Sequence, residues 1–503
     1  MIRTQQKRVP WRWPVYLGVL AAGIAFANGN VGAPLTLTVK KFVDKPWLIV
    51  MITSVNQAFS MLVAPYASWK ADRIWTRFGR RKPFMMLGWV LMAVGLAIVP
   101  FAPNVWILML AIIIWQVSFD FGYVGVWTPL CFEVVPSPQR GRAQVIRKFI
   151  GIPISLFFNW VLIRQFEEHY SLSPGTWLEK VPWLSRLVRD GWTIQFTGEH
   201  VIYLSGVAAL GVILTMLIFG LKETRPDKAV TGERFALGRF FLSLFGNRQW
   251  RMIYLLIFCV ACMTAGLAAL GTLLIKEQFH YDMKDLGMMT TISIILEVSI
   301  ILPLAALVVD RFNRFRIFQV GLLLSTIHPI AFWLFVKYLA PNHIPAIPWI
   351  IFFTMFNAVV DGTASIALEP LIFDLIPRSH MGTVNSGFLL IRGMLGIGIT
   401  NGVGFWVTGH AWLWGLPSVA DKEGKLMQTY DYMSGYLYVF ALGVAGCLVA
   451  WYFGRELRSG RIIQYGKLED EAHPATMPAG QVAPAPAGQA DTAPSPDRPA
   501  EKA

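Results

Sequence analysis

Charged side chains interrupt several long apolar stretches of this sequence, and a charge in such a place is usually paired or functional. They are Asp120, Glu297, Asp361, Glu369 and Arg392. An ionised group in hydrocarbon costs roughly 2.5–3.5 kcal/mol on insertion scales, so it persists only where something compensates for it. Arg392 could form a static ion pair with one of the acids in its own half of the chain. Alternatively, a desolvated carboxylate could take up a proton as another ligand binds; we expect Asp120 and Asp361 to be the first candidates, followed by Glu297.

Uncharged polar side chains and tryptophans lie in the same stretches and could bind a polar molecule. A polar molecule is typically bound by a few hydrogen-bonding groups that converge beside an aromatic ring. The candidate solute-binding residues are Asn28, Asn56, Gln57, Trp115, Gln116 and Asn357. Each could instead have a packing role, because Asn often joins neighbouring membrane helices and Trp often lies at the membrane surface. We expect His328, next to Pro329, to be a histidine with satisfied hydrogen bonds and not a proton relay.

Apolar helices must position these residues. Of 503 residues, 55% are hydrophobic and 15% are charged, whereas an ordinary soluble domain has roughly a quarter charged residues. Apolar segments of about 20 residues can each cross a hydrocarbon core roughly 30 Å thick as a helix. The sequence predicts twelve such spans, near residues 13–37, 48–68, 84–100, 105–135, 149–163, 200–221, 252–275, 286–309, 317–338, 348–376, 384–408 and 432–454. The predicted fold class is an all-α membrane protein with 12 transmembrane helices, and the first span is too long to be a cleaved signal peptide.

The two halves of the sequence resemble each other. "DFGYVGVWTPLCFEVVPSPQRG" begins at Asp120 and "DGTASIALEPLIFDLIPRSHMG" begins at Asp361, and they align without a gap at a single offset of 241 residues. Seven positions match or are chemically alike in this register, Pro129 with Pro370 among them. The match predicts an internal duplication that gives two six-helix bundles.

The predicted parts of the chain follow from this division. A basic segment with the amphipathic stretch "FALGRFFLSLF" separates the bundles and is expected to lie at the membrane surface. A final segment rich in Pro, Ala and Gly is expected to be disordered. The predicted boundaries are 1–221 for the first bundle, 222–251 for the linker, 252–456 for the second bundle and 457–503 for the tail.

Charge and cysteine content limit the possible functions. The net charge of +14 comes from residues scattered over many loops, so it indicates membrane topology and not nucleic-acid binding. With an even number of spans, both termini lie on the same side of the membrane. Most basic residues lie on that side, and Lys and Arg accumulate on the cytoplasmic side. The sequence therefore predicts a multi-pass protein of the plasma membrane with both termini in the cytoplasm. The four cysteines lie in or at the edge of apolar spans, where packing is their expected role. No paired-Asp metal motif, no nucleophile beside a base and no nucleotide-binding glycine loop is present, so we expect neither an enzyme nor a cofactor nor ATP-driven chemistry.

The stretch "WKADRIWTRFGRRKPFMML", from Trp69 to Leu87, crowds basic residues around one acid, and "DRFNRFR" from Asp310 repeats part of it in the second half. The duplication places a further acid at the rim of the fourth and tenth spans. Removing one partner of a desolvated Arg-carboxylate pair costs on the order of 3 kcal/mol or more, so such pairs could latch one conformation. The predicted inner latch comprises Asp72, Arg73, Arg80, Arg81 and Glu133 in the first half, and Asp310, Arg311, Arg314 and Asp374 in the second.

The motif "ADRIWTRFGRRKP" resembles the loop of the major facilitator superfamily, and its ending "RFGRRKP" is similar to that of sucrose carriers and of the glycoside-pentoside-hexuronide cation symporters. Asp120 precedes Pro129 by a spacing similar to that in sucrose carriers. The intervening "FGYVGVWT" replaces the polar residues of those carriers, so another sugar or small polar solute remains open. The resemblance implies a transporter whose loop helps to hold the outward-open state.

The expected function is secondary active transport of a sugar or glycoside by proton-coupled symport, with alternating access, in a protein that works as a monomer in the lipid bilayer. Sodium coupling stays open beside proton coupling. One alternative is an exporter or antiporter of the same fold, although "FIGIPISLFFNW" lacks the repeated glycines of drug antiporters. Another is a non-transporting sensor or assembly factor, which would have little need for acids in mid-membrane.

Overall fold

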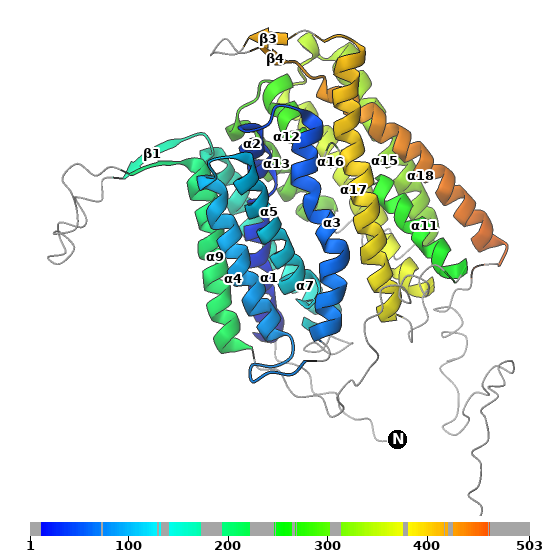
Figure 1. Ribbon diagram of the computed structural model, residues 1–503. Coiled ribbons are helices and arrows are strands. Elements are labelled where there is room, and N and C mark those ends of the chain that lie inside the picture. Colours follow the sequence, from blue (N-terminus) through cyan, green and yellow to red (C-terminus); the bar gives the residue numbers. More distant parts are fainter. Residues whose placement is uncertain are drawn as a thin grey trace, which may run out of the picture.

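The described part of the computed structural model is helical apart from two short hairpins (Figure 1). It comprises residues 12–71, 74–127, 130–131, 140–172, 194–221, 246, 248–263, 267, 269–301, 313–375, 381–416, 418–420, 426–460 and 462. Within these residues, six helical stretches are long and apolar enough to cross a membrane: Arg12–Lys40, Lys82–Phe101, Val105–Val124, Gly198–Gly220, Phe315–Leu339 and Tyr432–Arg458. Shorter apolar helices cover Pro46–Val55, Phe149–Gln165 and Ile347–Gly362.

Helices of the N-terminal half precede residue 222, and those of the C-terminal half follow residue 247. The first set is α1 (Arg12–Gly29), α2 (Ala33–Lys40), α3 (Pro46–Ala71), α4 (Lys82–Ile98), η1 (Val99–Phe101), α5 (Val105–Phe119), η2 (Asp120–Val124), α7 (Arg140–Phe157), η4 (Phe158–Leu162), η5 (Ile163–Gln165) and α9 (Gly198–Gly220). The second set is α11 (Arg248–Met263), α12 (Leu270–Leu273), η6 (Leu274–Gln278), α13 (Met283–Leu296), η7 (Glu297–Ile301), α15 (Arg314–Leu334), η8 (Phe335–Leu339), η9 (Pro341–His343), α16 (Ile347–Leu375), α17 (Met381–Leu413), η11 (Tyr432–Ser434) and α18 (Gly435–Arg458).

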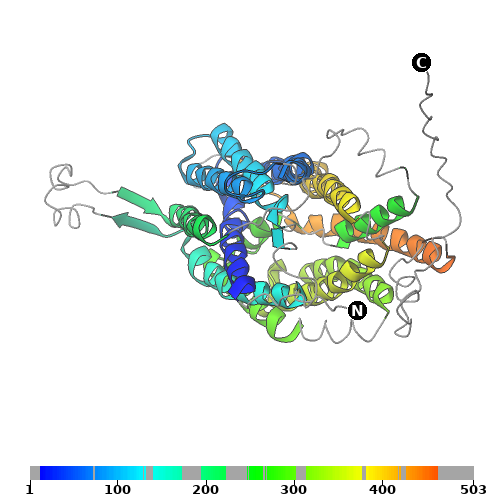
Figure 2. The same cartoon turned by 90° about the horizontal axis from the view of Figure 1, so that it is seen from below.

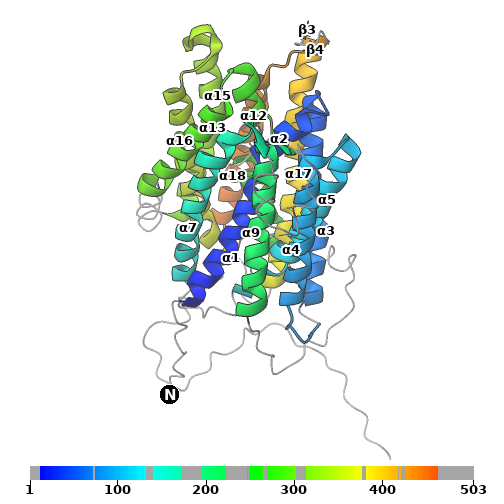
Figure 3. The ribbon, with the colours of Figure 1, turned by 90° about the vertical axis from the view of Figure 1, so that its left-hand side faces the viewer.

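Two antiparallel hairpins modify the all-α prediction. β1 (His169–Leu172) pairs with β2 (Ile194–Thr197), and β3 (Ser418–Ala420) pairs with β4 (Leu426–Gln428). Both lie at the same end of the molecule, which we call the hairpin end (Figure 1). At the opposite end α1 begins and residues 74–81 join α3 to α4, and we call this the basic-loop end (Figure 3).

The first predicted span is two helices, which corrects the single helix expected over 13–37. Residues 30–32 separate α1 from α2, and the N–H groups of Val31 and Gly32 donate to carbonyls only three residues back. Pro34 explains the break, because its ring lacks an N–H and clashes with the carbonyl four residues earlier, that of Asn30.

Close contacts between small residues set the helix pairs within each half. A Cβ added to Gly88 on α4 would lie 2.5 Å from the Cα atom of Gly122 in η2. In the second half, a Cβ added to Gly321 on α15 would lie 2.6 Å from the Cβ atom of Ala364 on α16. Small residues let membrane helices approach closely. The corresponding helix pairs of the two halves are therefore packed in the same way.

The halves lie side by side, as the view along the helices shows (Figure 2), and α3 packs against α17 between them. Near the hairpin end, the rings of Trp47 and Phe405 stack with centroids 5.5 Å apart, and the Trp47 N–H donates to Thr408 Oγ1 over 3.2 Å. On the other side of the molecule, a Cβ on Gly287 of α13 would lie 2.5 Å from the carbonyl oxygen of Asn159 in η4. These contacts hold the two halves together toward the hairpin end.

Candidate functional site

Asp120 is fully buried where α5 passes into η2, and an amide one turn earlier holds its carboxylate. Gln116 Nε2 donates to Asp120 Oδ2 over 3.0 Å. The acid lies 15 residues after Val105, which is about 22 Å along a helix from the hairpin end. Asp120 therefore lies well inside the apolar stretch, and its depth in the membrane stays a prediction. Gln116, predicted to bind solute, binds the carboxylate.

Asp361 has the same arrangement in the second half, where two donors hold its carboxylate. Asn357 Nδ2 donates to Asp361 Oδ2 over 2.9 Å, and the hydroxyl of Ser325 on α15 donates to Oδ1. Asp361 lies 14 residues after Ile347, so its depth matches that of Asp120. Its side chain is half-buried.

The offset of 241 residues that relates the two acids also relates Gln116 to Asn357. The duplication has therefore preserved a complete unit, an amide and the carboxylate it holds four residues later, at equal depth in each half. Hydrogen bonds of this kind favour the ionised form of a carboxylate, whereas burial favours the protonated form. A group under two opposed influences is suited to bind and release a proton.

Two of the predicted acids begin a widened helical turn. Asp120 opens the π-helical turn η2, and Glu297 opens the π-helical turn η7. Such turns are rare and are frequent at functional sites. Three other π-helical turns, η4, η6 and η8, begin at apolar residues, so the turn alone does not distinguish Glu297. Glu297 lies half-buried on a different helix from either amide-carboxylate unit and stays a candidate.

Two buried polar atoms without a described partner and a row of aromatic rings lie on the same helical stretch as Asp120. Gln116 Oε1 and Trp115 Nε1 are buried and find no hydrogen-bond partner among the described residues. Trp115, Phe119, Tyr123 and Trp127 stack in sequence along α5 and η2, with centroids 5.3–5.6 Å apart. Buried polar atoms are normally hydrogen-bonded, so these two are available to a hydroxyl-bearing guest or to water.

The remaining predicted site residues are placed less completely. Asn28 is on α1 with an exposed side chain. The structure describes only the backbone of Asn56, Gln57, Glu369 and Arg392, which lie in α3, α3, α16 and α17 respectively. Their roles, including the expected ion pair of Arg392, stay predictions.

His328 meets the expectation of satisfied hydrogen bonds only in part, because its ring interacts with the backbone of Phe353 but one nitrogen has no described partner. Its Nε2 atom is buried and has no partner within the described residues. The imidazole lies among the rings of Phe332, Phe353 and Phe356, with centroids 6.0–6.4 Å away. The apolar surroundings leave this nitrogen without a donor or acceptor.

The inner latch also stays a prediction. Most of its members lie outside the described residues: Asp72, Arg73, Glu133, Asp310 and Arg311. For Arg314 and Asp374 the structure describes only the backbone. Arg80 is half-buried and Arg81 is buried beside the first turn of α4, where its carbonyl accepts from the N–H of Phe84.

Lys82, in the same basic loop, has a structural role. Its Nζ donates to the carbonyls of Ile218 and Leu221 over 2.6 and 2.9 Å at the end of α9. A cation is favourable there because the last carbonyls of a helix lack partners and its C-terminus is the negative end of the helix dipole. The loop therefore fastens α4 to α9 as well as supplying arginines.

Ion pairs between the halves lie at the hairpin end, and sequence analysis missed them. Lys40 Nζ lies 3.3 Å from Glu277 Oε1, and Lys284 Nζ lies 3.0 Å from Glu168 Oε1. A further pair joins Lys276 to Glu167. Each of these charged residues lies at the end of an apolar stretch, and this position was the available sequence signal for a charge at the membrane surface. The partner of each lies more than 100 residues away in the sequence and was not predictable.

Hydrogen bonds within the C-terminal half hold the residues on its side of this contact. The Tyr432 hydroxyl donates to Glu277 Oε2 over 2.7 Å, and Gln278 Nε2 donates to Asp431 Oδ1 over 3.0 Å. Burial and the nearby carboxylate of Asp44, in the other half, raise the pKa of Tyr430 above its ordinary value. The described contacts between the halves thus form a closed hairpin end.

A family model described as MFS/sugar transport protein matches residues 43–453. The chain belongs to this family. The match covers both halves, so the superfamily resemblance seen in the basic loop is confirmed, and the protein is a multi-pass membrane transporter and not an enzyme. No curated protein matches the sequence.

Solved structures of transporters share the fold. The crystal structure of a D-xylose-proton symporter aligns over 88% of this chain and 98% of its own, with a TM-score of 0.60 and 13% identity. The nucleoside transporter NupG aligns over 88% and 99%, with a TM-score of 0.62 and 11% identity. A POT family transporter in complex with 5-aminolevulinic acid aligns over 88% and 96%, with a TM-score of 0.62 and 12% identity. Because one fold accommodates such different solutes, the solute must be argued from the site.

Proposed function

We propose that this MFS transporter moves a sugar or a related small polar solute by proton-coupled symport with alternating access. The duplicated amide-carboxylate units, Gln116 with Asp120 and Asn357 with Asp361, are the observation that supports it most. A carboxylate in the middle of the membrane destabilises the protein, so its presence by default marks a functional site. The family description and the likeness to a D-xylose-proton symporter agree with a sugar as solute.

In this proposal, proton uptake converts one carboxylate from an acceptor of hydrogen bonds into a group that can also donate one. The neutral acid no longer requires its amide, which becomes free to bind a solute hydroxyl. Near Asp120 the free atoms of Trp115 and Gln116 provide a further donor and acceptor. Solute and proton would then bind together, which is the basis of symport.

The orientation is part of the proposal. The basic-loop end faces the cytoplasm, since Lys and Arg accumulate in cytoplasmic loops. The structure, closed by contacts at the hairpin end, is then a state closed toward the outside. The opposite state would require those contacts to break and the predicted inner latch to form.

Uptake into proteoliposomes tests the proposal. An inward proton gradient should drive accumulation of a labelled sugar from a panel of pentoses, hexoses and glycosides. Asp361→Asn or Asp120→Asn should abolish accumulation against a gradient while counterflow exchange of the same sugar continues, because a neutral amide cannot take up the proton. Glu456→Gln, which alters a buried acid far from both units, is the control and should leave coupling intact. Gradient-driven accumulation in both Asn variants would exclude proton coupling through these acids.

A further inference from the structure

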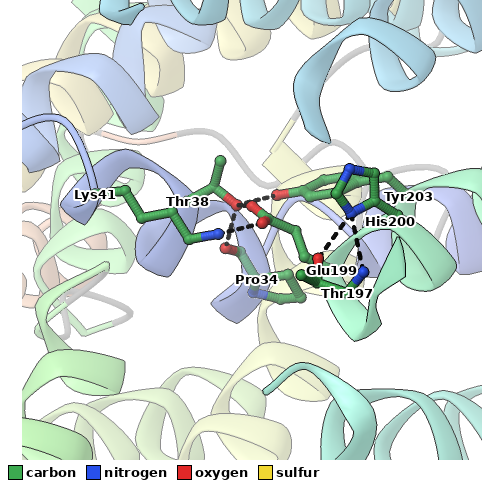
Figure 4. A network of polar contacts seen from close by, with 7 residues as sticks. All are labelled: Pro34, Thr38, Lys41, Thr197, Glu199, His200 and Tyr203. Carbon is green, nitrogen blue, oxygen red and sulfur yellow. Dashed lines mark hydrogen bonds and ion pairs between the residues drawn. The ribbon is translucent and has the colours of Figure 1, made fainter. Parts of the chain in front are cut away.

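Glu199 is a buried acid that the proposed transport site does not use. It lies in the first turn of α9 at the hairpin end and is 4% exposed. Figure 4 shows its carboxylate between Thr38 of α2 and Lys41, the residue that caps the C-terminus of α2: Oε1 accepts from the Thr38 hydroxyl and Oε2 pairs with Lys41 Nζ. Thr38 Oγ1 is also 3.1 Å from the hydroxyl of Tyr203 on α9. The carboxylate therefore fastens α2 to α9 within the N-terminal half.

Helix α2 needs such a fastening because it is not continuous with α1. Eight residues long, it follows the break at residues 30–32, where the buried Asn30 side chain finds no hydrogen-bond partner among the described residues. Backbone hydrogen bonds of a continuous helix therefore do not fix the rotation of α2. Thr38 lies in α2, and Lys41 is its C-cap with a helical backbone, one turn further on. Both side chains therefore project to the same side, and their bonds to Glu199 fix that rotation.

Lys40 shows what this rotation determines. It is the neighbour of Lys41 on a helix, so it projects about 100° away. Its Nζ meets Glu277 of the other half at 3.3 Å, and the same Glu277 accepts from the Tyr432 hydroxyl. One face of α2 is thus bound to its own half, and the adjacent face reaches across to the other.

We propose that Glu199 is a positioning residue for closure of the hairpin end: it holds α2 in the rotation that brings Lys40 to Glu277. This inference rests on the alternating access of the proposed function. When the hairpin end opens, the contact between Lys40 and Glu277 breaks, whereas the contacts of Glu199 stay within one half. Glu199 then keeps α2 ready to close again.

A double-mutant cycle tests this role through the distance between the halves. Spin labels at Phe101→Cys and Trp412→Cys, exposed positions of opposite halves at the hairpin end, are introduced with the four native cysteines replaced by Ala. Without solute or gradient, Glu199→Gln and Lys40→Met should each raise the ratio of the long-distance to the short-distance population about fivefold. The double variant should match Lys40→Met alone, because Glu199 acts through Lys40. Thr38→Val, which removes one donor to Glu199, should shift the ratio in the same direction and serves if Glu199→Gln folds poorly.

Glu456→Gln is the matched control. Glu456 is 5% exposed and pairs with Arg248 at 2.8 Å inside the C-terminal half, so its loss should not change the distance. If Glu199→Gln lowers the melting temperature without changing the distance, or if its effect adds to that of Lys40→Met, Glu199 is a structural residue only. A distance that no variant changes also overturns the inference. Because no transport is measured, a failure of proton-coupled uptake would be recognised separately.

Discussion

Asp361 has two donors to its carboxylate, and one can be removed with little change of shape. Ser325→Ala deletes the hydroxyl that bonds Oδ1. The variant should lose about 1–3 kcal/mol of unfolding free energy at pH 8, where the ionised, half-buried carboxylate keeps the Asn357 amide but loses its hydroxyl donor. The loss should shrink as the pH falls and the acid becomes neutral. Denaturant unfolding in micelles measures it, and Ser325→Thr, which keeps a hydroxyl, is the control. An equal loss at every pH would show that Ser325 matters only for packing.

Sequence analysis identified Asp120 and Asp361, because a charge in an apolar stretch is visible without a structure. Their partners divide into two kinds. Gln116 and Asn357 lie four residues before the acids, and this helical spacing could have assigned them to the carboxylates and not to the solute. Ser325 comes from another helix. Its contact depends on how α15 packs against α16, which one sequence does not specify.

Because small residues allow the close approach of some helix pairs, the effect of adding one methyl group on stability should depend on the position of the glycine. Gly88→Ala and Gly321→Ala place a Cβ within 2.6 Å of an atom on the facing helix, so each should cost about 1–3 kcal/mol of unfolding free energy through overpacking. Gly211→Ala on α9, where a Cβ meets nothing within 4 Å, is the matched control and should stabilise the protein by roughly 0.5–1 kcal/mol because Ala favours helix. Thermal unfolding in detergent measures all three. Stabilisation by Gly88→Ala would contradict the close approach of α4 and η2.

The spans were predictable as elements because hydropathy and length determine them. The break in the first span was not predicted, because hydropathy averaged over about 20 residues does not reveal a local interruption of the helix. Pro34 and Gly32 were the available signals, and they specify the break through the missing N–H and the weak helix propensity of Gly. The hairpins in the long loops have no strong pattern, and they depend on the helices that bring their strands together.

The whole molecule should respond in opposite directions to changes at its two ends. Glu277→Gln weakens the described contact at the hairpin end, so it should lengthen the distance between labels at Phe101→Cys and Trp412→Cys. Glu133→Gln, in the predicted inner latch, should lengthen the distance between Phe78→Cys and Tyr452→Cys and slow transport while solute binding persists. Each change favours one of two states that differ by a few kcal/mol. If Glu133→Gln leaves the second distance unchanged, the latch does not exist in the predicted form.

The paired amide-carboxylate units also have an implication for how the protein evolved. An ancestral protein of six helices would have contained one such unit, and two copies joined about a twofold axis would have contributed two identical acids. Fusion of the copies into one gene released that symmetry. The second unit now has an amide shorter by one methylene and a serine donor on Asp361, so the two acids are no longer interchangeable. If one unit accumulated substitutions while the other continued to bind a proton, a protein with two protonation sites would become a protein with one.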